Sequence, residues 1–162
     1  STPKLSLGVS YDMNNGAGKN RGQNGSFLNV SDEDNLKTLS TVFADLMFKY
    51  QGFSVMAEYA DKAATDDNPV VMEGSNIVGT YYTGSGISMQ AGYMFDSNYE
   101  IAIRYTAINP DEVVDQKDNR YTLGLNKFFV GHKLKLQTDI TYRDRETSND
   151  QLTYRLQMDL HF

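Results

Sequence analysis

The sequence contains no cysteine and only two histidines among its 162 residues. The lack of cysteine excludes a disulfide framework, a thiolate metal site and a thiol nucleophile, and it suits a protein that passes through an oxidising compartment. No apolar run approaches the roughly 20 residues that a membrane-spanning helix needs, and the mean hydropathy is −0.52. A helical membrane protein is therefore excluded.

Basic residues are in the minority. The chain has 15 Lys and Arg against 21 Asp and Glu, which gives a net charge of −6. Because contacts with nucleic-acid phosphates need clustered Lys and Arg, we expect no nucleic-acid partner. The first residues, STPK, lack the basic and apolar regions of a signal peptide, so we expect a mature chain or a piece of a longer one. The length is that of a single domain spanning residues 1–162.

The sequence is rich in strict alternation of apolar and polar residues. The clearest case is QLTYRLQMDLHF at residues 151–162, where every second residue from Leu152 to Phe162 is apolar. A period of two places alternate side chains on opposite faces of a β-strand. The pattern predicts eight strands, at residues 5–11, 41–50, 53–59, 87–95, 99–107, 121–125, 133–143 and 151–162.

The predicted connections alternate between short and long. The short ones lie at 51–52, 96–98 and 130–132, whereas the long ones lie at 14–37, 61–86, 109–119 and 144–150. The long connections are rich in Gly, Asn, Asp and Ser, which favour turns and solvent. Outer-membrane barrels have short periplasmic turns and longer extracellular loops. We therefore expect the long set outside the cell, and the chain start and end both on the periplasmic side.

Alternation alone is also compatible with a soluble antiparallel sandwich. The placement of aromatic residues favours a membrane, because Tyr and Phe gather near the strand ends on the apolar face, where such rings prefer the lipid interface. Strands of about 9 to 11 residues also match a tilted membrane crossing. We expect an all-β fold, a transmembrane antiparallel up-and-down β-barrel that contacts outer-membrane lipid and lipopolysaccharide. The aromatic set is Tyr11, Phe48, Tyr50, Phe53, Tyr93, Phe95, Tyr99, Tyr142, Tyr154 and Phe162.

The chain ends on Phe162 after an alternating strand. This ending resembles the C-terminal signature by which outer-membrane barrels are recognised for assembly. The resemblance implies that Phe162 is an assembly signal and that the barrel assembly machinery is a partner.

Several longer segments carry a family resemblance. They are TVFADLMFKYQGFS at 41–54, AEY at 57–59, QAGY at 90–93, EIAIRY at 100–105, YTLGL at 121–125 and VGHKLK at 130–135. Together they resemble the C-terminal half of the phosphate-selective porin O and P family. The resemblance implies a location in the outer membrane of a Gram-negative bacterium. It also implies a sixteen-stranded barrel, usually trimeric, that passes small solutes, of which eight strands would be about half.

Two architectures are compatible with eight strands. In the first, the chain is the C-terminal half of a sixteen-stranded porin that passes small hydrophilic solutes or ions by passive diffusion. In the second, eight strands close alone into a small barrel that acts as a structural or partner-binding subunit of an outer-membrane complex. Sixteen strands leave an aqueous channel, whereas eight leave an interior that side chains fill. We rank the porin first.

The polar face of the predicted strands supplies the candidate pore or barrel-interior residues. Five cations and five carboxylates balance, so they would form ion pairs in a filled barrel or screened wall charges in a wide pore. Because this segment shows no basic excess, phosphate selectivity is not carried over from the resemblance. The candidates are Asp45, Lys49, Glu58, Glu100, Arg104, Lys133, Lys135, Asp139, Arg155 and Asp159.

The sequence gives no support for catalysis, and we expect neither an enzyme nor a bound cofactor. His132 lies in a predicted turn and His161 next to the end of the chain, and neither has a serine nearby on the same strand face. Two histidines do not make a convincing metal site. The carboxylates Asp111, Glu112, Asp115 and Asp118 lie in a predicted loop, but their spacing fits no defined calcium loop.

Overall fold

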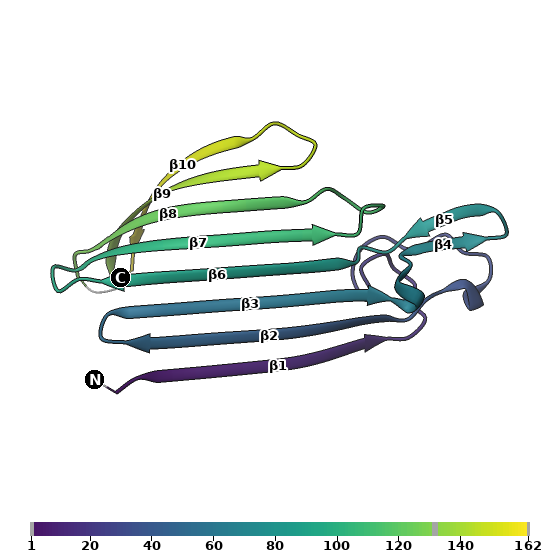
Figure 1. The fold of residues 1–162 in the computed structure, drawn as a ribbon, viewed down its shortest axis with the longest axis horizontal. Coiled ribbons are helices and arrows are strands. Elements are labelled where there is room, and N and C mark those ends of the chain that lie inside the picture. Colours follow the sequence, from purple (N-terminus) through teal and green to yellow (C-terminus); the bar gives the residue numbers. More distant parts are fainter. Residues whose placement is uncertain (1, 131–132, 162) are drawn as a thin grey trace.

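The computed structural model describes residues 2–130 and 133–161, and its regular structure there is almost entirely β. One antiparallel sheet of eight strands makes up most of the fold, with a separate two-stranded hairpin at one end (Figure 1). The strands are β1 (Lys4–Asn14), β2 (Leu39–Tyr50), β3 (Phe53–Ala64), β4 (Val70–Glu73), β5 (Asn76–Thr80), β6 (Gly84–Met94), β7 (Tyr99–Pro110), β8 (Asp118–Phe128), β9 (Leu134–Arg145) and β10 (Gln151–Leu160). Two short 3₁₀ helices, η1 (Glu33–Asn35) and η2 (Thr65–Asp67), lie in the loops. Within the described ranges no helix is long and apolar enough to cross a membrane.

The eight strands follow one another in chain order, β1-β2-β3-β6-β7-β8-β9-β10, each antiparallel to the next. Short turns, such as Gln51-Gly52, lie at one end of the sheet, and the four long connections lie at the other (Figure 1). We call these ends the turn rim and the loop rim. β1 begins and β10 ends at the turn rim, as the sequence predicts. Among the described residues β1 pairs only with β2 and β10 only with β9, so the sheet is not closed.

The register places apolar and polar residues on opposite faces of the sheet. One continuous row across all eight strands consists of Leu7, Leu46, Ala57, Met89, Tyr105, Tyr121, Tyr142 and Leu152. The next row towards the loop rim lies on the opposite face and contains only small or polar residues, namely Gly8, Asp45, Glu58, Ser88, Thr106, Arg120, Arg143 and Gln151. Because side chains alternate along each strand, the sheet has one apolar face and one polar face.

The eight predicted strand segments all lie in the eight-stranded sheet, but their limits differ. β8 has 11 residues, Asp118–Phe128, where the sequence predicted only 121–125. The sequence did not reveal where β8 begins, because its first three residues are all polar. Asp118, Asn119 and Arg120 pair with β7 but do not continue the alternation of apolar residues. β3, β6 and β7 also extend further towards the loop rim than predicted.

The segment 61–86, predicted only as a long connection, contains regular structure. This segment contains β4 and β5, which pair around Gly74, whose φ of +59° favours glycine in a tight turn. The β-branched Val70, Val71 and Ile77 favour strands, but a run of four or five residues is too short for alternation to reveal.

The buried core of the described structure lies at the loop rim and not within the sheet. Residues 15–38 and 65–83, which we call the loop cap, pack together around Val71 and Tyr81, both 0% exposed. Leu39 and Ala64, at the rim ends of β2 and β3 on the polar face, complete this core. Two loops that are far apart in the sequence therefore fold as one unit over the end of the sheet.

Candidate functional site

Nine of the ten predicted interior residues lie in strands and share the polar face of the sheet. The tenth, Lys133, precedes β9. Two ion pairs link β9 and β10, Arg155 Nε to Asp139 Oδ2 at 3.3 Å and Lys135 Nζ to Asp159 Oδ2 at 3.0 Å. The polar face at this edge of the sheet is thus a ladder of compensated charges.

Two other predicted interior residues form hydrogen bonds with neutral side chains of neighbouring strands. Arg104 Nε donates to Gln90 Oε1 at 2.9 Å across β6 and β7. Asn126 Nδ2 donates to Glu100 Oε2 at 2.8 Å across β7 and β8. These contacts fix the two side chains along the wall of the sheet.

Asp45 and Glu58 stand directly opposite each other in the pairing of β2 and β3. Two like charges at such a position destabilise a sheet unless water and ions screen them. Gly8 on β1 provides the space for Asp45, because a Cβ at Gly8 would lie 2.0 Å from Asp45 Oδ2. This acidic pair is better suited to a hydrated surface than to a dry interior.

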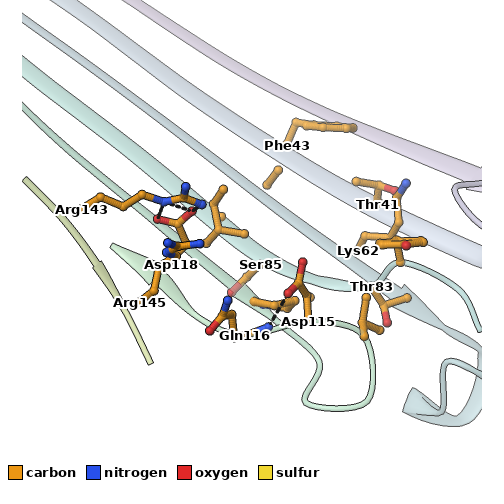
Figure 2. Close-up of a pocket in the computed structure, with 17 residues that line it drawn as sticks. Thr41, Phe43, Lys62, Thr83, Ser85, Asp115, Gln116, Asp118, Arg143 and Arg145 are labelled. Carbon is orange, nitrogen blue, oxygen red and sulfur yellow. Dashed lines mark hydrogen bonds and ion pairs between the residues drawn. The ribbon is translucent and has the colours of Figure 1, made fainter. Parts of the chain in front are cut away.

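A hollow of about 580 Å³ opens on the polar face next to the loop rim (Figure 2). We call it the mouth hollow. One register row crosses its floor through six strands: Phe43, Ala60, Gly86, Ile108, Asp118 and Arg145. The connection between β7 and β8 contributes Val114, Asp115 and Gln116 to its lining. The hollow therefore lies between the strand wall and an inward-folded loop.

Asp118 organises the charges beside the mouth hollow. It is 7% exposed and forms an ion pair with Arg120 at 2.8 Å. It also pairs with Arg143, whose Nε donates to Asp118 Oδ2 at 2.9 Å (Figure 2). Arg120 and Arg143 are directly opposite each other in the pairing of β8 and β9. The single carboxylate thus compensates two cations that would otherwise repel.

Sequence reasoning missed this group because it assigned Asp118 to the loop 109–119 and left Arg120 outside the predicted strand. Arg143 and Arg145 were visible at the end of an alternating segment, but only the pairing of strands shows that they meet Asp118. The signal that could have found Asp118 and Arg120 is their parity, which continues that of Thr122 and Gly124.

Two of the loop carboxylates considered as calcium ligands, Asp111 and Asp118, have other contacts. Asp111 accepts a hydrogen bond from the Thr83 hydroxyl, and Asp118 is paired as described. The part of the chain that the structure describes contains no group of three or more His, Cys, Asp or Glu side chains placed to hold a metal ion. His161 lies beyond β10, where its backbone N–H donates to the Lys133 carbonyl, while His132 and Phe162 lie outside the described residues.

Specific hydrogen bonds hold the loop cap together. The Tyr81 hydroxyl donates to the Ala17 carbonyl at 2.7 Å and accepts from the Lys37 N–H at 3.1 Å, and burial raises its pKa above the ordinary value. The Glu73 carboxylate accepts from the N–H groups of Asp32 and Ser31, which lower its pKa. Hairpin β4–β5 is thereby attached to the loop after β1.

The family resemblance is confirmed by comparison with known proteins. The family model for phosphate-selective porin O and P matches residues 2–162, which includes every strand described above. Comparisons with curated proteins and with solved structures found no match. The chain therefore belongs to the phosphate-selective porin O and P family, whose members are bacterial outer-membrane porins.

Proposed function

We propose that the eight-stranded sheet is part of the wall of a transmembrane β-barrel channel that passes small hydrophilic solutes or ions by passive diffusion. The observation that carries this proposal is the division of the sheet into one apolar and one polar face. The apolar row from Leu7 to Leu152 would face lipid and lipopolysaccharide, and the polar row from Gly8 to Gln151 would face water. An apolar-out, polar-in wall is the arrangement of outer-membrane channels.

The exposure of the apolar face supports placement in lipid. Leu7 is 67% exposed, Ile103 58% and Leu156 62%, and each belongs to a continuous apolar surface. Soluble monomers rarely expose contiguous apolar patches larger than a few hundred Å². In a bilayer the same surface is solvated by acyl chains, so its exposure carries no cost.

The polar face favours a wide, hydrated barrel over a filled one. Asp45 and Glu58 are adjacent like charges, and a narrow interior of low dielectric would make this pair strongly unfavourable. Backbone groups at the open edges of β1 and β10 must also be paired within lipid. Further strands between these edges, as in a sixteen-stranded barrel, would pair the edge backbone groups and leave a wide, hydrated interior. A closed eight-stranded barrel would instead require β1 to pair with β10.

The expected partners follow from this placement. Recognition by the barrel assembly machinery and assembly into a homotrimer or a larger membrane complex stay predictions.

The first test is the intact mass of the protein extracted from its native membrane, followed by its conductance in planar lipid bilayers. We expect a mass of about twice 18.2 kDa or more and stable open channels. A mass near 18.2 kDa without conductance would overturn the channel and favour the small closed barrel with a structural or partner-binding role.

Two neighbouring residues provide a matched test of which face lines the lumen. Glu58 lies on the polar face and Tyr59 on the apolar face of β3. Removing a wall charge changes the local ion concentration in a pore, so we expect Glu58→Gln to shift the reversal potential in a salt gradient towards anions. Tyr59→Phe should leave it unchanged. Equal effects of both variants would contradict the assignment of faces.

A further inference from the structure

The mouth hollow combines an apolar floor with a cationic side. Phe43, Ala60, Gly86 and Ile108 form one part of the floor row, and Asp118 and Arg145 continue it. Ala60 and Gly86 have the smallest side chains of the row, so the floor is deepest at β3 and β6. Tyr82, Pro110 and Val114 add apolar surface around this part.

The charges that line the mouth hollow are unevenly compensated. Lys62, Arg143 and Arg145 line it together with the carboxylates of Asp115 and Asp118. Asp118 is already engaged by Arg143 and by Arg120. Its carboxylate is therefore not free to compensate the remaining cations.

Arg145 is a lining cation with spare hydrogen-bonding capacity. One terminal nitrogen donates to the Asn149 carbonyl at 3.3 Å, a neutral acceptor. Its Nε is buried and has no acceptor among the described residues. A buried donor without an acceptor is costly. Because the Arg145 guanidinium lines the hollow and has only neutral acceptors among the described residues, an anion placed there would compensate its charge.

The size and composition of the hollow indicate the class of ligand. Its volume of about 580 Å³ is within the range of small-molecule sites, about 300 to 1,000 Å³. A strongly hydrated inorganic anion gains nothing from an apolar floor, whereas an apolar group that leaves water for such a floor is stabilised. The site thus fits a ligand that has an anionic end and an apolar body.

We propose that the mouth hollow is an entry subsite for small organic anions with an apolar body, of which aromatic carboxylates are the simplest. The carboxylate is bound by Arg145, and the ring lies over Ala60, Gly86 and Ile108. Arg143, held by Asp118, adds positive potential beside it. The role in uptake rests on the proposed channel function, while binding itself does not require conduction.

The test uses benzoate as the probe, with the protein extracted from its native membrane. Isothermal titration calorimetry in detergent at neutral pH measures binding, and reduction of channel conductance by benzoate in planar bilayers measures occupancy of the solute path. Inorganic phosphate and benzyl alcohol, at matched concentration and ionic strength, separate the contributions of charge and ring.

Two variants remove the two halves of the site, each with a matched control. Arg145→Gln removes the cation, and Arg155→Gln removes an arginine of the same face that pairs with Asp139 outside the hollow. Gly86→Leu fills the floor; its Cβ would meet only the Ala107 carbonyl, at 3.7 Å. Gly124→Leu makes the same change on β8, where a Cβ has equally ordinary contacts, the nearest at 3.8 Å. Circular dichroism verifies the β content of each variant.

We expect saturable benzoate binding that is weakened about tenfold or more by Arg145→Gln and by Gly86→Leu, and that changes less than about twofold in the two controls. Phosphate and benzyl alcohol should bind more weakly than benzoate. Absence of benzoate binding, equal binding of phosphate, or equal losses in test and control variants would overturn the subsite. Benzoate binding to a protein that does not conduct would instead overturn the channel and leave the subsite standing.

Discussion

Among single residues, Asp118 has the densest set of charged contacts described on the polar face. It receives hydrogen bonds from Arg120 and Arg143, which lie opposite each other on β8 and β9. Like charges directly opposite in an antiparallel pair are destabilising. The carboxylate therefore keeps the loop-rim ends of these two strands together.

Replacing Asp118 by Asn tests this role. We expect Asp118→Asn to separate the ends of β8 and β9, so that amide hydrogen exchange at 118–122 and 141–145 becomes about tenfold or more faster. Asp139→Asn is the control, since Asp139 pairs with Arg155 alone among the ion pairs described. Unchanged exchange in Asp118→Asn, or an equal effect at the same amides in the control, would contradict this account.

Tyr81 is the residue on which the two segments of the loop cap converge. Its side chain is 0% exposed, and its hydroxyl makes hydrogen bonds to Ala17 and Lys37. Removing a buried hydroxyl with two partners leaves them unsatisfied, which costs about 1 to 3 kcal/mol. We expect Tyr81→Phe to accelerate proteolysis within 15–38. The neighbouring Tyr82→Phe, in a side chain that is 44% exposed, should have no such effect.

At the scale of elements, hairpin β4–β5 is linked to the loop after β1 through Glu73. The N–H groups of Asp32 and Ser31 donate to its carboxylate and lower its pKa below the ordinary value of 4.5. A carboxyl whose pKa is lowered in the folded state stabilises the fold at pH values above its ordinary pKa. This contribution is lost as the pH falls through the lowered pKa.

We expect the contact between the Glu73 carboxylate and the N–H groups of Ser31 and Asp32 to hold at neutral pH and to weaken below about pH 4.5. NMR of the protein in detergent micelles would show the Ser31 and Asp32 amide resonances moving together as Glu73 is protonated. In Glu73→Gln this transition should be missing. A transition of the same midpoint in Glu73→Gln would assign it to another group and contradict this account.

At the scale of the whole molecule, the pairing of the two outer strands determines whether the sheet is part of a closed barrel. β1 and β10 each have one neighbour among the described residues, and their apolar residues continue the apolar face of the sheet. An unpaired strand edge is unfavourable in a bilayer. In the native membrane we expect the amides on the outer edges of both strands to be protected from hydrogen exchange as strongly as those of β6. Rapid exchange at either edge would contradict a closed barrel.

Much of the sheet was predictable because the alternation that identifies each strand lies within a few consecutive residues. Alternation located all eight strands of the sheet, and parity alone placed Asp45, Glu58, Arg104 and Asp139 on one face. Pairing in chain order then follows from the short turns between antiparallel strands. What alternation could not reveal were the polar beginning of β8 and the short strands β4 and β5.

The sequence by itself determined an antiparallel sheet with an apolar and a polar face, because side-chain direction in a strand depends only on position along the chain. Only the tertiary structure decided which residues meet across strands and loops. It joined Asp118 to Arg143, folded residues 15–38 and 65–83 into one cap, and opened the mouth hollow between Phe43 and Arg145. These contacts depend on register and loop folding, which arise from residues far apart in the sequence.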